Sequence, residues 1–281
     1  MTEGEQLLRR VLVGTDGSAR AEEAVRQGAR LTAVTGGALE VVYVLDTGRA
    51  HDEDVRREAE EALARASSLA AEAGSEADVR IVAGDPAEAL VTEAEEAGVD
   101  LVCLGPDTGL LGGAIRIGHV AAHVMRNAVW SVLLARRSEV PGFPAQILCG
   151  VDGSEASVET AMLAARIASA SGARLRLLHV IPVFRGGDTE WTLDEDEASP
   201  PELEPSVVAA SSRGVVPLRE MAMGRPEHAI VASAAREETD LLVVGHRGVK
   251  GVRRVLLGSV SEYCAVHAPC SVLVARPASR P

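Results

Sequence analysis

The same segment opens each half of this chain, and this repeat restricts the fold more than any other feature of the sequence. Residues 10–18 read Arg-Val-Leu-Val-Gly-Thr-Asp-Gly-Ser, and residues 146–154 read Gln-Ile-Leu-Cys-Gly-Val-Asp-Gly-Ser. The halves also end alike, with Ser-Val-Leu-Leu-Ala-Arg at 131–136 and Ser-Val-Leu-Val-Ala-Arg at 271–276. Similarity of this kind indicates that one structural unit occurs twice. A chain of 281 residues is long enough to hold two domains.

The boundary between the copies is predicted in a short segment that contains two prolines, a glycine and a charge. Such compositions are typical of linkers, because few contacts cross them. We therefore predict a first domain at 1–138, a linker at 139–146 and a second domain at 147–281.

Short apolar segments alternate with amphipathic ones within each half. Aromatic residues make up only 2% of the chain, so aliphatic side chains must build the core. Both features are typical of parallel sheets joined by right-handed helical crossovers, an α/β fold with helices on both faces of the sheet. In the first half, strands are predicted at 10–15, 39–45, 79–82, 101–104 and 131–135, and helices at 19–35, 52–73, 86–97 and 120–127.

The second half departs from the first at one place. Where the first half has its long charged helix, residues 184–205 are rich in acidic side chains and prolines, which prevent a continuous helix. We predict a mobile acidic loop followed by a short helix at 206–212. A lid or a partner site is one interpretation of this loop, and a tolerated surface insertion is the other.

Composition limits the function classes that remain. The net charge of −13 opposes binding to a polyanion, and the low aromatic content removes the stacking platforms of single-strand binders, so no nucleic-acid partner is expected. No apolar run is long enough to span a membrane, and the polar N-terminus does not resemble a signal peptide. We therefore expect a cytoplasmic protein without a membrane partner.

The four cysteines of the chain are expected to be reduced thiols. Cys264, His267 and Cys270 are spaced as candidate metal ligands, but a structural zinc site needs four. Packing residues at the end of a helix and the start of a strand are the alternative, and no metal site is predicted.

Glycines are placed at a spacing suited to phosphate in the second half. Gly245-x2-Gly248-x9-Gly258-Ser259 follows the apolar run that ends at Val244 and precedes a predicted helix that opens at Val260. A glycine-rich turn between a strand and a helix N-terminus exposes main-chain N–H groups that bind phosphate oxygens. A purely structural alternative exists, because Ser259-Val-Ser-Glu262 fits a capping box. That alternative does not require Gly245 and Gly248 at their spacing.

These features together resemble the universal stress protein family in its tandem two-domain form. The resemblance covers nearly the whole chain and rests on Asp-Gly-Ser after the first strand of each copy, on the glycine pattern and on the closing strand. It implies two Rossmann-like domains, each with a five-stranded sheet of order 3-2-1-4-5. It also implies bound ATP, with Mg²⁺ as a candidate companion, and pairing of the last strands of two domains. Here that pairing would be intramolecular, giving a pseudo-dimer, and a homodimer is left open.

The resemblance also implies roles for individual residues. Asp152, beside Val151, would lie by the ribose, although Asp152-Gly-Ser154 also reads as a simple turn and helix cap. Val180 would bind adenine through its main chain, or would be a plain strand residue. Arg247 and Lys250 would reach the terminal phosphate. The phosphate loop itself would consist of Gly245, Gly248, Gly258, Ser259 and Val260, with Ser261 as a further contact.

The first copy has lost part of this motif. Thr108 stands in the place of Gly248, and His119 stands in the place of Ser259. Pro106 removes an N–H donor within the loop, while Gly109 lies one residue too late to restore the spacing. We predict weak ATP binding or none in the first domain. His119 as a catalytic base is an alternative to simple decay of the site. The retained positions are Asp16, Val44, Gly105 and Gly118.

The function expected from the sequence is that of a cytoplasmic ATP-binding regulatory protein of the stress response, with nucleotide held mainly in the second domain. No obvious in-line nucleophile or acid–base pair is present, so at most slow ATP hydrolysis is expected. One alternative is a nucleotide-independent module that acts through dimerisation. Another is an adenylating or ATP-hydrolysing enzyme, disfavoured because the loops after the first strands lack the tandem glycines of Ser-Gly-Gly-x-Asp-Ser. No Walker motif is present either.

Overall fold

The first half of the protein forms a complete strand–helix alternation. The computed structural model describes residues 7–48, 52–106, 117–137, 142–183, 200–236, 238–246 and 258–276. The elements of the first half are β1 (Arg10–Thr15), α1 (Ala19–Thr35), β2 (Ala38–Leu45), α2 (Glu53–Glu72), β3 (Ala77–Ala83), α3 (Pro86–Ala97), β4 (Leu101–Leu104), α4 (His119–Asn127) and β5 (Ser131–Leu134).

The second half repeats this order with one shorter helix. Its elements are β6 (Gln146–Val151), α5 (Glu155–Ser171), β7 (Arg174–Pro182), α6 (Glu204–Ser211), β8 (Leu218–Gly224), α7 (Pro226–Arg236), β9 (Leu241–Gly245), α8 (Ser259–His267) and β10 (Ser271–Ala275). The predicted short helix is therefore present as α6, two residues earlier than expected at its start. The predicted acidic loop lies outside the described residues from 184 to 199, and its last residues lead into α6.

Capping residues explain where the first helix of each half begins and ends. Ser18 and Ser154 hold extended backbone and accept N–H bonds from the first turns of α1 and α5. Gly36 and Gly172 adopt left-handed backbone at the other ends, with φ of 71° and 74°. Glycine reaches that conformation without the penalty that a Cβ would impose, so α1 ends where the sequence predicts and α5 ends in the same way.

All strands belong to one ten-stranded sheet of order β3-β2-β1-β4-β5-β10-β9-β6-β7-β8. Each half has the strand order 3-2-1-4-5 that the family resemblance implied, and strands within a half are parallel. The halves meet where β5 and β10 pair antiparallel, with Leu133 opposite Leu273. The last strands thus join the two copies within one chain.

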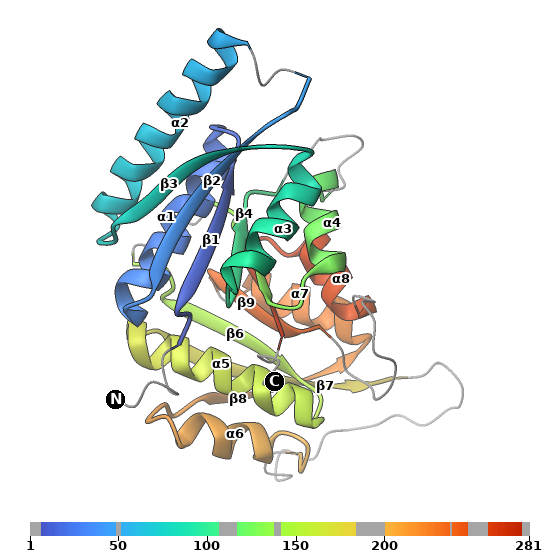
Figure 1. Cartoon of the computed structure of the whole chain (residues 1–281). Helices are drawn as coiled ribbons and strands as arrows, with labels where there is room; N and C mark the ends of the chain where they lie inside the picture. The colour runs from blue at the N-terminus through green and yellow to red at the C-terminus, as the bar shows by residue number, and fades with distance from the viewer. Residues whose placement is uncertain are drawn as a thin grey trace.

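Helices cover both faces of the continuous sheet, as predicted. The hydrophobic core on one face includes residues from α1, α2, α5 and α6, and the core on the other face includes residues from α3, α4, α7 and α8. In Figure 1 the latter four helices lie together on one side of the strands. Each of these two large cores contains residues from both halves of the chain, whereas a small third cluster of Leu45, Val55 and Ala59 belongs to the first half alone.

Candidate functional site

The carboxyl ends of β6 and β9 form the point in the second half where strand order reverses. β6 and β9 are neighbours and parallel, with Cys149 opposite Val243. Val151 and Gly245, the last residues of the two strands, therefore lie at the same edge of the sheet. Ligands of open α/β sheets bind at this edge, at the strand-order reversal. The structure thus brings these two predicted site residues to one place.

Asp152 lies in a tight turn directly after β6. Its Oδ1 accepts hydrogen bonds from the Ser154 N–H at 3.0 Å and from the Ser154 hydroxyl at 2.6 Å. Ser154 in turn accepts from the Ser157 N–H at 3.2 Å and caps α5. The predicted turn and cap are therefore formed. Asp152 is also solvent-exposed, so its carboxylate retains capacity to accept bonds from a ligand hydroxyl.

Two segments border this turn. His179 Nδ1 lies 3.1 Å from the Val151 carbonyl oxygen, which fixes β7 against β6 beside the site. The next residue, Val180, is 7% exposed and packs in one of the two cores. On the other side, a Cβ at Gly153 would lie 2.9 Å from Cβ of Glu202, so the residues that precede α6 lie against the turn.

Gly245 and Gly258 are brought together although twelve residues separate them in the sequence. The Gly258 N–H donates to the His246 carbonyl at 2.9 Å, and the His246 N–H donates to Ala275 at 3.1 Å. The Ser261 side chain is buried, and its hydroxyl donates to the Gly245 carbonyl. The hydroxyl proton of Ser261 is therefore used within the protein. These bonds place the start of α8 at the end of β9. No sequence motif predicts the main-chain role of His246.

The N-terminus of α8 corrects one prediction. Gly258 is the N-cap residue and makes no side-chain cap bond, while Ser259 is already the first helical residue. The capping box with Ser259 as N-cap is therefore wrong. Closure of the loop onto His246 makes the helix begin one residue earlier in the chain than that capping box requires. The first helical bond joins the Glu262 N–H to the Gly258 carbonyl at 2.9 Å. The N–H groups of residues 259–261 precede this bond and have no acceptor within the helix.

Three predicted site residues, Arg247, Gly248 and Lys250, lie outside the described residues. Their roles therefore rest on the sequence pattern alone. The described residues on both sides of them, Gly245 and Gly258, form the base of the loop in which they stand.

The first half retains a hollow at the corresponding edge, between the carboxyl ends of β1 and β4. It has a volume of about 280 Å³, and its lining includes Asp16, Val44, Gly105 and His119. A Cβ at Gly105 would lie 2.8 Å from the main chain of Arg20, so only glycine fits there. The helix end at this hollow has Gly118 as N-cap, and His119 occupies its first helical position.

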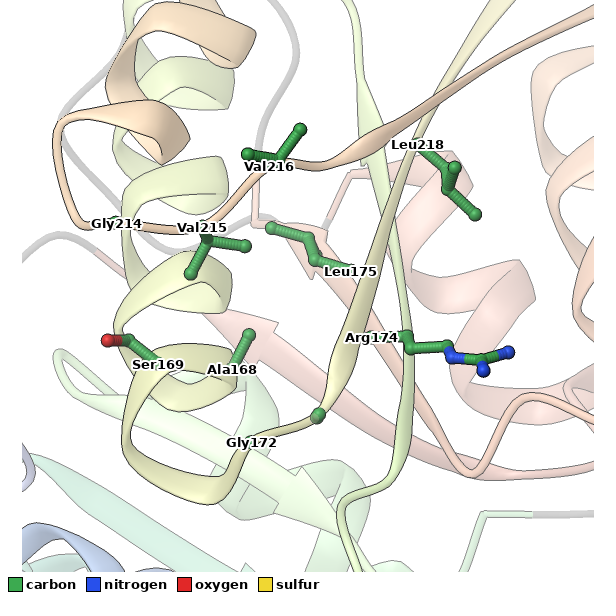
Figure 2. A pocket seen from close by; sticks show the side chains of 10 residues that line it. Ala168, Ser169, Gly172, Arg174, Leu175, Gly214, Val215, Val216 and Leu218 are labelled. Atoms are coloured by element: carbon green, nitrogen blue, oxygen red, sulfur yellow. The ribbon is translucent and has the colours of Figure 1, made fainter.

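A second hollow lies at the opposite edge of the sheet. Figure 2 shows it between the end of α5 and the first residues of β7 and β8, with Gly172, Arg174 and Leu218 in its lining. Its volume is about 590 Å³. Because it opens at the amino ends of the strands, it is separate from the site described above.

The cysteine chemistry agrees with a packing role. All four cysteines are buried free thiols, and burial raises the pKa of Cys149, Cys264 and Cys270 to about 12. Loss of solvation disfavours the thiolate, which is the form that binds metal. Within the described part of the chain, no group of three or more His, Cys, Asp or Glu side chains is arranged to hold a metal ion.

Comparison with known proteins identifies the family. The model of the universal stress protein family matches the chain twice, at residues 8–136 and 145–276. The chain belongs to the universal stress protein family. The two matches agree with the repeat in the sequence and with the two halves of the sheet.

Curated universal stress proteins match about half of the chain. MJ0531 of Methanocaldococcus jannaschii is 35% identical over 138 residues, which cover 47% of this chain and 81% of the relative. A universal stress protein of Thermus aquaticus is 35% identical over 136 residues, which cover 46% of this chain and 97% of the relative. One chain of this protein thus contains two units of the size that those relatives have once.

Solved structures of the family include one of the same extent. A universal stress protein of Archaeoglobus fulgidus aligns with 95% of this chain and 98% of its own, with a TM-score of 0.75 and 21% identity, which shows a shared fold. A universal stress protein solved in complex with cAMP aligns with 47% of this chain, with a TM-score of 0.40 and 27% identity. In the described part of this protein, no helix has the length and apolar character that crossing a membrane requires.

The difference between the two copies predicts that the first one can be repaired. We expect the double substitution Thr108→Gly and His119→Ser to add one ATP-binding site per chain, in the first domain. The glycine allows close approach of the main chain, and the serine removes the imidazole from the start of α4 and supplies a hydroxyl. Isothermal titration calorimetry measures the stoichiometry. An unchanged stoichiometry would contradict this explanation of the first site.

Proposed function

We propose that this universal stress protein is an ATP-binding regulatory protein of the stress response, and that it holds the nucleotide mainly in the second domain. One observation carries the proposal. The uncapped N-terminus of α8 lies at the end of β9, one strand away from Asp152, and the loop between β9 and α8 bears the glycine pattern of a phosphate site.

Each group has a chemical task in this proposal. The N–H groups of residues 259–261 point along a helix axis whose dipole favours negative charge, so they bind phosphate oxygens. Gly245, Gly248 and Gly258 keep side chains out of the phosphate path. Asp152 accepts bonds from ribose hydroxyls, and the main chain at Val180 borders the adenine. Arg247 and Lys250 neutralise the terminal phosphate, alone or together with Mg²⁺.

The overall charge of −13 is compatible with this ligand. Main-chain N–H groups and a helix terminus act within a few ångströms, whereas charges that lie farther away than a Debye length of about 10 Å are largely screened. The same net charge still opposes a long polyanion, which would extend over the acidic surface. The charge distribution therefore favours a small anion such as a nucleotide over a nucleic acid.

A nucleotide-independent interaction module is the second candidate, because the pairing of β5 with β10 requires no ligand. Thermal unfolding with and without ATP and Mg²⁺ distinguishes the two functions. A specific ligand at about a hundredfold excess over its Kd stabilises the folded state by about 2.7 kcal/mol. An unchanged Tm, together with no nucleotide released from the denatured protein, would favour the interaction module.

Lys250 permits a sharper test, because it is the only lysine in the chain. An acyl-phosphate derivative of ATP, bound at the proposed site, transfers its acyl group to a nearby lysine amine, and the acyl-phosphate bond breaks. We expect acylation of Lys250 that excess ATP prevents, read out by peptide mass mapping. The Lys250→Arg variant is the control, since it retains the charge without the reactive amine. Labelling of Lys250 that excess ATP does not reduce would contradict the proposed site.

A further inference from the structure

Two arginines cross between the halves of the protein. The guanidinium of Arg136, which follows β5, donates to the carbonyl oxygen of Cys270 at 3.2 Å and to that of Ala265 in the last turn of α8. At the equivalent position of the second half, Arg276 donates to two carbonyls at the end of α4. These are the carbonyl of Met125, at 2.6 Å, and that of Ala128. Each half therefore supplies a cation to the C-terminal end of the last helix of the other half, where the helix dipole favours positive charge.

The sequence makes the end of α8 depend on this contact. The carbonyl of Ala265 would normally accept from the N–H four residues later, but that residue is Pro269, which has none. Arg136 supplies the missing donor from the other half of the chain. In α4 the equivalent residue is Val129, whose N–H makes no bond to the Met125 carbonyl within the described part of the chain, because extended backbone at Ala128 (ψ 137°) ends the helix. The two helix ends are thus alike, and each receives a donor from an arginine of the other half.

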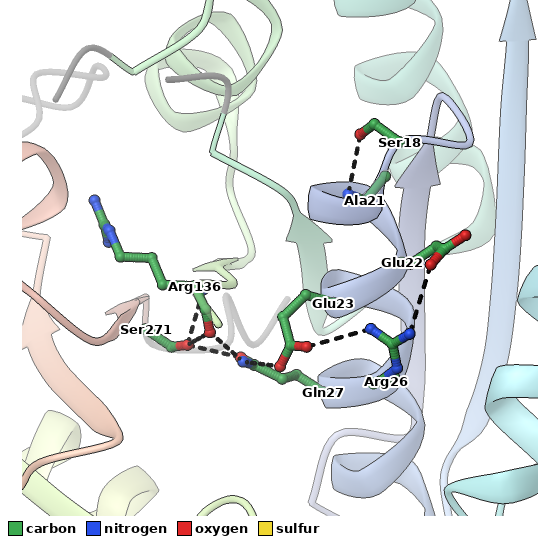
Figure 3. A network of polar contacts seen from close by, with 8 residues as sticks. All are labelled: Ser18, Ala21, Glu22, Glu23, Arg26, Gln27, Arg136 and Ser271. Carbon is green, nitrogen blue, oxygen red and sulfur yellow. Dashed lines mark hydrogen bonds and ion pairs between the residues drawn. The ribbon is translucent and has the colours of Figure 1, made fainter. Parts of the chain in front are cut away.

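A buried cluster of polar side chains also holds the main chain of Arg136 in place. The Gln27 amide donates to the Arg136 carbonyl at 2.7 Å, and the Arg136 N–H donates to the Ser271 hydroxyl oxygen at 3.0 Å. The Ser271 hydroxyl donates to the Gln27 side chain at 2.8 Å, and both residues are almost fully buried. Figure 3 shows this cluster at the side of α1, with the Arg136 guanidinium pointing away from it.

The cluster is not repeated in the second half. Ser131 is the counterpart of Ser271 and accepts from the Arg276 N–H at 3.1 Å. The counterpart of Gln27, however, is Leu163, whose side chain makes no hydrogen bonds. Arg136 is itself only 8% exposed. The first half, which is the copy with the degenerate phosphate motif, therefore holds Arg136 in place against α8.

We propose that Arg136 is the positioning residue through which the first domain sets the nucleotide affinity of the second. α8 has only nine residues, so a shift at its C-terminal end is transmitted to the N–H groups at its N-terminal end. Hydrogen bonds to phosphate depend on the position of those groups within fractions of an ångström. The identity of the ligand, ATP, rests on the proposed function. The contacts of Arg136 with α8 are independent of that proposal.

Arg276, the counterpart of Arg136 in the second half, provides a matched control. We expect Arg136→Ala to weaken ATP binding to the second domain by about tenfold, within the usual range of coupling between sites. Arg276→Ala removes an equivalent side chain and should change this affinity by less than about twofold. The helix that Arg276 contacts is α4, which belongs to the first domain. The carbonyl of Ala275, which accepts from His246, is main chain and is retained in that variant. Calorimetry at a temperature well below both Tm values measures the affinities.

Amide hydrogen exchange tests the positioning without nucleotide. In Arg136→Ala, faster exchange is expected in α8, whereas in Arg276→Ala it is expected in α4. If Arg136→Ala does not fold, Gln27→Leu serves instead, since it gives α1 the residue that α5 has at Leu163. That variant should weaken ATP binding in the same direction by a smaller factor.

Equal ATP affinities in the two arginine variants would overturn the proposal, and so would unchanged exchange in α8 of Arg136→Ala. A wild-type protein that binds no ATP would contradict the proposed function and, with it, the effect on affinity. The exchange experiment would then decide by itself whether Arg136 holds α8.

Discussion

The Gly248→Val substitution is expected to abolish ATP binding while leaving the fold intact. Gly248 stands in the sequence between Gly245 and Gly258, which the structure brings together beside the first N–H groups of α8. A β-branched side chain in this loop would occupy the space that the phosphates need and would restrict the main chain. We expect ATP affinity to fall at least about a hundredfold, which corresponds to about 2.7 kcal/mol. Isothermal titration calorimetry measures the loss.

Thr108→Val is the matched control, because Thr108 holds the corresponding position in the first domain. Valine replaces threonine with little change of volume, and the second domain is untouched, so ATP binding should remain normal. Thermal unfolding should be cooperative in both variants. If Gly248→Val binds ATP with wild-type affinity, the glycine loop is not the phosphate site.

Leu273→Ala is expected to destabilise the whole protein by about 3 kcal/mol, the usual cost of truncating a fully buried leucine. Leu273 is completely buried in β10 and lies opposite Leu133 at the junction of the two halves. Because both large cores include residues from both halves, we expect a single unfolding transition that moves as a unit to lower temperature. Differential scanning calorimetry measures both the shift and the number of transitions.

Leu218→Ala provides the comparison for this core variant. Leu218 is 59% exposed at the start of the edge strand β8, so its truncation should change stability by less than about 0.5 kcal/mol. Two separate transitions, only one of which shifts in Leu273→Ala, would show that the halves unfold independently and would contradict the shared cores.

Local features of the sequence predicted most of the fold. Gly36 ends a helix because glycine accommodates left-handed backbone, and Pro86 begins one at the predicted residue. Asp152 and Gly245 lie at one edge of the sheet because each comes at the carboxyl end of a predicted strand, and parallel strands present these ends on one side. These features depend on neighbouring residues or on strand direction alone.

Features that depend on the packing of distant segments could not be predicted. Ser259 is a normal N-cap residue by sequence, yet Gly258 takes that position because its N–H bonds His246 across the loop. Arg136 gave no signal at all, since its partners on α8 come from the other half of the chain. In both cases a contact between residues far apart in sequence overrides or adds to the local pattern.

The start of α8 should bind the phosphates of ATP, and a crystal structure of the protein with a non-hydrolysable ATP analogue and Mg²⁺ would reveal this contact. We expect phosphate oxygens about 2.7–3.2 Å from the main-chain nitrogens of residues 259–261, with no triphosphate at His119. A triphosphate bound in the first domain, or a nucleotide whose phosphates point away from α8, would contradict this expectation.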